Sequence, residues 1–135
     1  MADDSEVRFE RGMATRRRVL GDAYVDGAVA RTGALDAPFQ RYITEGPWGS
    51  VWSRDGLSLR ERSLVTLALL AGLGNWEEFA LHLRATANTG ASPEEVREAM
   101  LHVAVYAGAP AGNQAMKILK EIVAEREAGS ADATG

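Results

Sequence analysis

Glu78 and His82 are the two side chains whose types and spacing best suit acid–base chemistry. A separation of four residues places both on the same face of a helix. A carboxylate beside an imidazole can hold one tautomer and raise the pKa of the imidazole toward a general-acid role. The same pair can also be a plain surface pair contributing roughly 0.2–0.5 kcal/mol to helix stability, and the spacing leaves both interpretations open.

The composition excludes several other kinds of chemistry. The 135 residues include no cysteine and only two histidines, His82 and His102. Disulfides, thiolate nucleophiles, Cys-ligated zinc and iron–sulfur clusters are therefore excluded, as is a His-rich metal site. Glu78 and His82 do not form an HExxH or ExxH motif, and a third ligand is missing, so we expect no metal. His102 lies near a predicted helix end, where an imidazole simply favours the helix dipole.

A second group of residues could bind a carboxylate. Arg60 and Arg62 fall in the first turn of a predicted helix, where positive charges oppose the helix dipole. Either acidic neighbours such as Glu61 or an anionic ligand must compensate, because guanidinium groups at a helix N-terminus make good carboxylate sites. Just upstream, Trp48 and Trp52 lie in a glycine-rich segment and either fill the core or line a pocket.

The net charge and hydropathy of the chain argue against nucleic-acid and membrane partners. Fifteen Lys and Arg against 19 Asp and Glu give a net charge of −4, which argues against nucleic acid as a partner. The acidic N-terminus lacks the apolar region of a signal peptide. The longest apolar stretch, residues 64–73, is about half of the ~20 residues that a membrane span needs. We therefore expect a cytoplasmic protein with no membrane partner.

The sequence predicts that six or seven helices position these residues. Predicted helix starts include two capping boxes, Ser58 with Glu61 and Ser92 with Glu95. The expected helices cover residues 6–20, a short segment after Asp22, a segment from Asp36 that ends before Gly46-Pro47, residues 59–73, 75–89, 93–107, and a last helix from Pro110.

We expect one all-α domain over residues 1–135, with an ordered core at about residues 6–127 and fraying ends. The second half of the 59–73 helix is apolar nearly all round, which predicts that it is the buried central helix. Short turns at residues 74–75, 90–92 and 108–110 predict antiparallel neighbours.

A set of residues occurs in a fixed order along the chain: Arg11-Gly12, Arg16-Arg17-x-Val19-Leu20-Gly21, Trp48-Gly49-x-x-Trp52-x-Arg54-x-Gly56-Leu57, Arg60-x-Arg62-Ser63-Leu64, Leu70-Ala71-x-Leu73-Gly74, Glu78-x-x-x-His82-x-Arg84-Ala85-x-x-Asn88-x-Gly90, Glu95 and Tyr106-x-Gly108-x-Pro110-Ala111. With these residues the chain resembles, over residues 8–125, the γ-carboxymuconolactone (4-carboxymuconolactone) decarboxylase family, within the alkylhydroperoxidase-like superfamily. The peroxidases of that superfamily carry Cys-x-x-Cys seven and four residues before the helix histidine. The equivalent positions here are Asn75 and Glu78, so peroxidase activity does not carry over.

The resemblance implies an all-α alkylhydroperoxidase-like fold, a homohexamer or homotrimer, and no cofactor. It implies decarboxylation of 4-carboxymuconolactone to 3-oxoadipate enol-lactone and CO₂ in protocatechuate (β-ketoadipate) catabolism. We expect His82, oriented by Glu78, to act as proton donor or oxyanion partner. Arg62, or else Arg60 or Arg84, is expected to hold a carboxylate of the dicarboxylate lactone. Trp48 and Trp52 are expected to wall the pocket.

Two other functions remain open from the sequence. A decarboxylase of the same fold could act on a different lactone or a β-keto acid, and the 46–57 segment would then shape a different pocket. A non-catalytic helical oligomer with a stress or interaction role could keep the fold, although a helical core has no need for this set of Trp, Arg, Glu and His residues.

Overall fold

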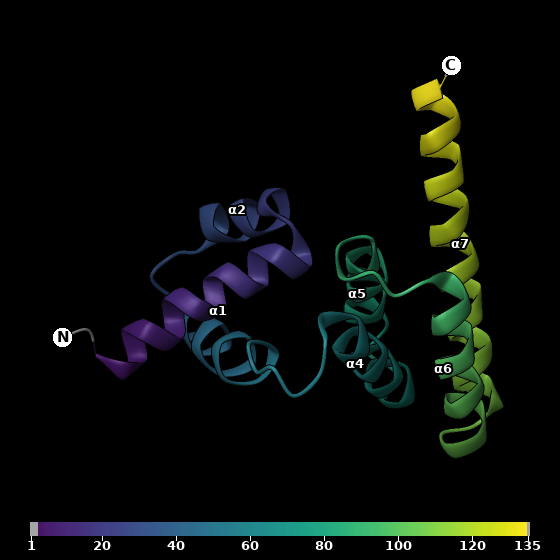
Figure 1. The fold of residues 1–135 in the computed structure, drawn as a ribbon, viewed down its shortest axis with the longest axis horizontal. Coiled ribbons are helices and arrows are strands. Elements are labelled where there is room, and N and C mark those ends of the chain that lie inside the picture. Colours follow the sequence, from purple (N-terminus) through teal and green to yellow (C-terminus); the bar gives the residue numbers. More distant parts are fainter. Residues whose placement is uncertain (1–2, 135) are drawn as a thin grey trace. The chain divides into compact units, whose positions relative to one another are not determined.

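The computed structural model describes residues 3–134, with side chains described through residue 130. Within that range the chain forms seven α-helices and one π-helical segment and no strand, which confirms the all-α prediction (Figure 1). The chain divides into two compact units, Met1–Leu59 and Arg60–Gly135. The elements in order are α1 (Asp4–Leu20), α2 (Asp22–Arg31), α3 (Ala37–Ile43), η1 (Thr44–Trp52), α4 (Leu59–Leu73), α5 (Trp76–Thr89), α6 (Pro93–Tyr106) and α7 (Ala109–Thr134).

The N-terminal unit is built on close contact between α1 and η1. A Cβ atom added to Gly12 would lie 2.0 Å from the backbone oxygen of Thr44, and one added to Gly49 would lie 2.4 Å from that of Arg8. Only glycine allows these two backbones to approach so closely. Arg11 Nε donates to Gly49 O at 3.0 Å across the same contact.

The segment after Ile43 corrects one prediction. We expected the helix to end before Gly46-Pro47, but the chain continues as the π-helix Thr44–Trp52 with Pro47 inside it. Pro47 is the fourth residue of this segment, so its missing N–H falls in the first π turn, where no partner inside the segment is needed. The indoles of Trp48 and Trp52 are therefore carried on a helical element and not on an irregular loop.

The C-terminal unit has a continuous apolar core from α4, α5, α6 and α7. The predicted capping box at α6 is confirmed, with Glu95 N donating to Ser92 Oγ at 3.1 Å and Ser92 N donating to Glu95 Oε1 at 3.0 Å. Gly90 has a φ of 87° and ends α5 as predicted. The buried core residues are Leu67, Ala71, Phe79, Leu83, Val96, Met100, Val103, Ala115, Leu119 and Ile122.

The surroundings of α4 also differ from the prediction. Leu67 and Ala71 are buried, but Val65, Leu69 and Leu73 are 50%, 60% and 74% exposed, so the chain covers only one face of α4. Because α4 is apolar nearly all round, its sequence pattern does not indicate which face the neighbouring helices cover. The last helix continues to Thr134. Among the described residues no helix is both long and apolar enough to cross a bilayer.

The close approach at Gly12 predicts a stability difference between two Gly→Ala variants. Gly12→Ala places a methyl group against the Thr44 and Gly49 backbones and should destabilise the protein by about 1–3 kcal/mol. Gly27→Ala, in α2, meets only the flexible end of Arg31 and should stabilise it by up to ~1 kcal/mol. Urea unfolding followed by circular dichroism measures both, and equal midpoints for wild type and Gly12→Ala would contradict the packing described.

Candidate active site

His82 lies on the buried face of α5. It shares that face with Phe79 and Leu83, which are 0% and 1% exposed, and is itself only 7% exposed. The spacing of three and four residues that aligns His82 with Phe79 and Thr86 is the spacing of a helix face turned to a core. The imidazole is therefore held on a rigid, tightly packed turn.

Glu78 does not offset the desolvation of the His82 imidazole. Its carboxylate Oε2 lies 3.9 Å from His82 Nε2, and its side chain is 60% exposed. That separation is too long for a hydrogen bond, and an ion pair would form only with a protonated imidazole. The predicted pairing on one helix face is confirmed, but the contact is loose.

The direction of the His82 pKa shift is opposite to the one expected from sequence. Burial lowers the pKa of His82 to about 4, because a desolvated site penalises the charged imidazolium. Glu78, mostly in water, does not reverse this effect. At neutral pH the side chain is therefore a neutral imidazole, with one N–H donor and one acceptor nitrogen.

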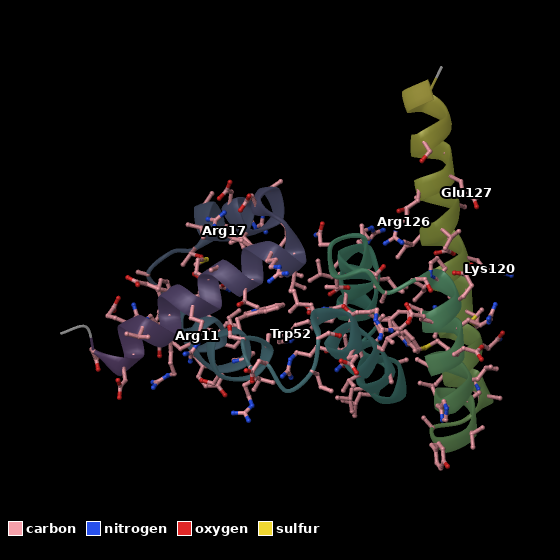
Figure 2. All side chains as sticks on the ribbon, in the orientation of Figure 1. Arg11, Arg17, Trp52, Lys120, Arg126 and Glu127 are labelled. Atoms are coloured by element: carbon pink, nitrogen blue, oxygen red, sulfur yellow. The ribbon has the colours of Figure 1, made fainter. Side chains whose placement is uncertain are left out.

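Arg126 of α7 forms hydrogen bonds to the helix turn that follows His82. Its Nη2 donates to Leu83 O at 2.8 Å, to Arg84 O at 3.3 Å and to Thr86 Oγ1 at 2.9 Å. Figure 2 shows Arg126 on the side of α7 that faces α5. Sequence reasoning missed this residue, since it is one of three charged residues in a row near the expected end of the last helix.

The three candidate arginines differ in their surroundings. Arg60 forms an ion pair with Glu95 of α6, and Arg84 Nη2 lies 3.4 Å from Glu125 Oε1 of α7. The acidic partner of Arg60 is thus supplied by another helix and not by Glu61. Arg62 is half-buried in the first turn of α4, next to Ser63, whose hydroxyl donates to Thr89 Oγ1 at 2.7 Å.

The two tryptophans of η1 lie against each other in the N-terminal unit, with their rings tilted. Trp48 and Trp52 are 7% and 9% exposed, and their ring centroids are 5.1 Å apart at a tilt of 33°. Ser53 Oγ donates to Trp48 O at 2.6 Å and fixes the end of the segment. Buried indoles of this kind serve a core or a closed pocket wall equally well.

The structure thus brings together two pairs of the predicted site residues, Glu78 with His82 and Trp48 with Trp52. Arg60, Arg62 and Arg84 belong to the C-terminal unit, as do Glu78 and His82. The other histidine, His102, is exposed and stacks on Tyr106 with ring centroids 6.4 Å apart. Within residues 3–134 no group of three His, Asp or Glu side chains is placed to hold a metal ion.

Comparison with known proteins adds a family and three relatives. Residues 37–121 match the sequence model of the carboxymuconolactone decarboxylase family. The chain is 40% identical to a 4-carboxymuconolactone decarboxylase of Acinetobacter baylyi over 88% of this chain and 89% of that protein. It is 42% identical to the nitrosuccinic acid decarboxylase npaB of Metarhizium robertsii over 85% and 80%, respectively. A 4-carboxymuconolactone decarboxylase of Pseudomonas putida is 39% identical over 34% of this chain and 96% of its own length.

The buried imidazole predicts that protein stability depends on pH. The unfolded state binds a proton at the ordinary His pKa of about 6.5 and the folded state only near 4, so protonation favours unfolding. The contribution of the neutral His82 side chain to the free energy of unfolding is complete above about pH 6.5 and is lost as the pH falls toward 4. The free energy of unfolding should drop by about 2 kcal/mol between pH 7 and pH 5.

Urea unfolding at several pH values tests this dependence, with His82→Gln as the matched variant that cannot titrate. The difference between wild type and His82→Gln should shrink as the pH falls. Parallel curves for the two proteins would show that the imidazole of His82 titrates normally.

Proposed function

The chain belongs to the carboxymuconolactone decarboxylase family, and from this membership we propose that it is a carboxy-lyase that converts 4-carboxymuconolactone to 3-oxoadipate enol-lactone and CO₂ without a cofactor. The observation that carries the proposal is the near-full-length similarity to an enzyme named for that substrate. A cytoplasmic location stays a prediction from the sequence.

The substrate supplies its own electron sink. The leaving carboxylate sits on the γ carbon of an α,β-unsaturated lactone. When the bond to CO₂ breaks, its electron pair moves through the double bond to the lactone carbonyl oxygen, and a proton is then added at the α carbon. The protein must hold the carboxylate perpendicular to the π system, stabilise negative charge on the lactone oxygen and allow protonation.

A neutral His82 suits the oxyanion role better than that of an imidazolium acid. With a pKa of about 4, His82 carries almost no positive charge at neutral pH, so it has no extra proton to give. A neutral imidazole N–H still donates a hydrogen bond to a developing oxyanion, and in a desolvated site that bond is strengthened. In this proposal Glu78 has at most a weak orienting effect.

Arg62 is our choice for the substrate carboxylate. The side chains of Arg60 and Arg84 are 44% and 55% exposed, and an ion pair with a substrate contributes little at such exposed positions. Arg62 is half-buried, and charge-assisted hydrogen bonds strengthen as water is removed.

A second substrate is favoured by a specific observation, the similarity to the nitrosuccinic acid decarboxylase of M. robertsii. In nitrosuccinic acid the nitro group beside one carboxylate accepts the electron pair, much as the unsaturated lactone does. Both substrates are dicarboxylates with an internal electron sink, so one arrangement of donors could serve either. Nitrosuccinic acid is neither a lactone nor a β-keto acid, the two alternative substrate classes expected from the sequence.

Parallel assays on both substrates test the proposed function. The purified protein should release CO₂ and enol-lactone from enzymatically generated 4-carboxymuconolactone, with a kcat/KM at least 100-fold above that for nitrosuccinate. A reversed ratio would assign the chain to nitro acid chemistry. Turnover of neither substrate above the protein-free rate would favour the non-catalytic interaction role instead.

Replacement of His82 should remove most of the activity. His82→Ala is expected to lower kcat by about 10²–10³-fold, the usual cost of removing an oxyanion donor. His102→Ala is the matched control, because His102 is exposed on α6 and should keep activity within threefold. Circular dichroism checks that both variants fold, and a folded His82→Ala variant with wild-type kcat would rule out this role.

The exposed apolar face of α4 supports a homohexamer or homotrimer. Val65, Leu69 and Leu73 repeat every four residues on one helix face and are 50–74% exposed. Leu101 and Val105 of α6, also four residues apart, are 57% and 74% exposed. Contiguous exposed apolar surface marks protein interfaces, and copies of one chain usually close with cyclic or dihedral symmetry.

Sedimentation velocity measures this assembly. Wild type should sediment as a trimer or hexamer, and Leu69→Glu should shift it toward monomer by placing a charge in the apolar face. Ala23→Glu, at an exposed position of α2, should leave the sedimentation coefficient unchanged. A monomeric wild type at micromolar concentration would be the contrary result.

A further inference from the structure

Two neighbouring residues of α7 contact the same turn of α5. At the surface, Glu125 Oε1 lies 3.4 Å from Nη2 of Arg84, and both side chains are more than half exposed. Arg126 is half-buried, and its Nη2 donates to three oxygens of the turn: Leu83 O at 2.8 Å, Arg84 O at 3.3 Å and Thr86 Oγ1 at 2.9 Å. Because an exposed ion pair contributes little, the contact that holds this turn is the one made by Arg126.

The hydrogen bonds of Arg126 form a closed network with Thr86. The Thr86 hydroxyl accepts from Arg126 Nη2 and donates to Leu83 O at 2.6 Å, an oxygen to which Arg126 Nη2 also donates. Leu83 and Thr86 are 1% and 4% exposed. Hydrogen bonds from a charged donor are stronger than neutral ones, and the exclusion of water strengthens them further. The network therefore fixes residues 83–86 against α7.

The apolar core joins α5 to α7 but does not by itself select one rotation of α5. Phe79 and Leu83 of α5 pack in one cluster with Leu119 and Ile122 of α7. Apolar burial is non-directional, so it holds two helices together while small rotations and shifts between them cost little. Hydrogen bonds weaken steeply when their angles change. Arg126 thus supplies directional contacts between the two helices.

His82 is coupled to this turn by the geometry of the helix. It directly precedes Leu83, and an α-helix pairs the C=O of residue 82 with the N–H of residue 86. Thr86 follows four residues later and is buried on the same helix face as the imidazole. A rotation or shift of residues 83–86 therefore moves the imidazole as well. Such a movement matters, because a catalytic donor must be held within about 0.5 Å of its productive position.

We propose that Arg126 is a positioning residue for His82: it fixes the rotation and register of α5 against α7 and thereby sets where the imidazole N–H points. Its expected effect on turnover rests on the proposed function, whereas its effect on the imidazole is measured without substrate. All three contacts of Arg126 come from one nitrogen, so a lysine ammonium with three N–H donors can replace part of the network.

The ring nitrogens of the two histidines report on the imidazole directly. Protein labelled with ¹⁵N at histidine is compared as wild type and as Arg126→Met, and His82→Gln and His102→Ala identify the two sets of signals. In Arg126→Met the His82 signals should shift or broaden because the ring samples other orientations, while those of the exposed His102 stay unchanged. Lys120→Met removes the same charge from an exposed position of α7 and should leave both sets unchanged.

Turnover of 4-carboxymuconolactone, expressed per folded protein, gives the second measurement. Arg126→Met should lower kcat at least tenfold and keep KM within threefold of wild type, because it misplaces the oxyanion donor and leaves Arg62 of α4 untouched. Arg126→Lys should recover kcat to within threefold of wild type. Lys120→Met should keep kcat within twofold.

Unchanged His82 signals in a folded Arg126→Met variant would overturn the proposal, and so would an equal change in Lys120→Met. If Arg126→Met does not fold by circular dichroism, Thr86→Val decides, because it keeps the side-chain shape and removes the hydroxyl that accepts from Arg126. It should change the His82 signals in the same way, and unchanged signals would again overturn the proposal. If wild type turns over neither substrate, the proposed function fails and the ring signals alone decide whether Arg126 orients His82.

Discussion

The desolvation of the His82 imidazole is the constraint on which the candidate site depends. Its helix turn places it beside Phe79 and Leu83, and burial lowers its pKa to about 4. Glu78, loosely placed at 3.9 Å and mostly in water, cannot restore the charge. The side chain can therefore act as a hydrogen-bond donor toward a developing oxyanion, and Arg126 holds the following turn of α5 in place.

The arginines differ in how far their side chains are exposed to water. Arg60 and Arg84 join α4 to α6 and α5 to α7 through Glu95 and Glu125. Such exposed pairs contribute little to stability. A half-buried guanidinium group such as that of Arg62 costs more to keep, and in the proposed function it binds a carboxylate of the substrate.

Local signals in the sequence predicted most of the helices, whereas features that depend on distant contacts were not predictable. The Ser92–Glu95 capping box and the Gly90 helix end require only neighbouring residues, and both are confirmed. The π-helix through Pro47 packs on α1 through Gly12 and Gly49, a contact between distant residues. The spacing of Glu78 and His82 predicted a shared face, but not how deeply the imidazole is buried, which sets the sign of its pKa shift.

The pH dependence of kcat/KM for decarboxylation of 4-carboxymuconolactone tests the central claim most directly. If His82 works as a neutral hydrogen-bond donor with a pKa of about 4, kcat/KM should be level between pH 5 and pH 8. A profile that rises toward acid with an inflection near 6.5, and that loses this inflection in His82→Gln, would show that a normally titrating imidazolium donates the proton and would contradict the account.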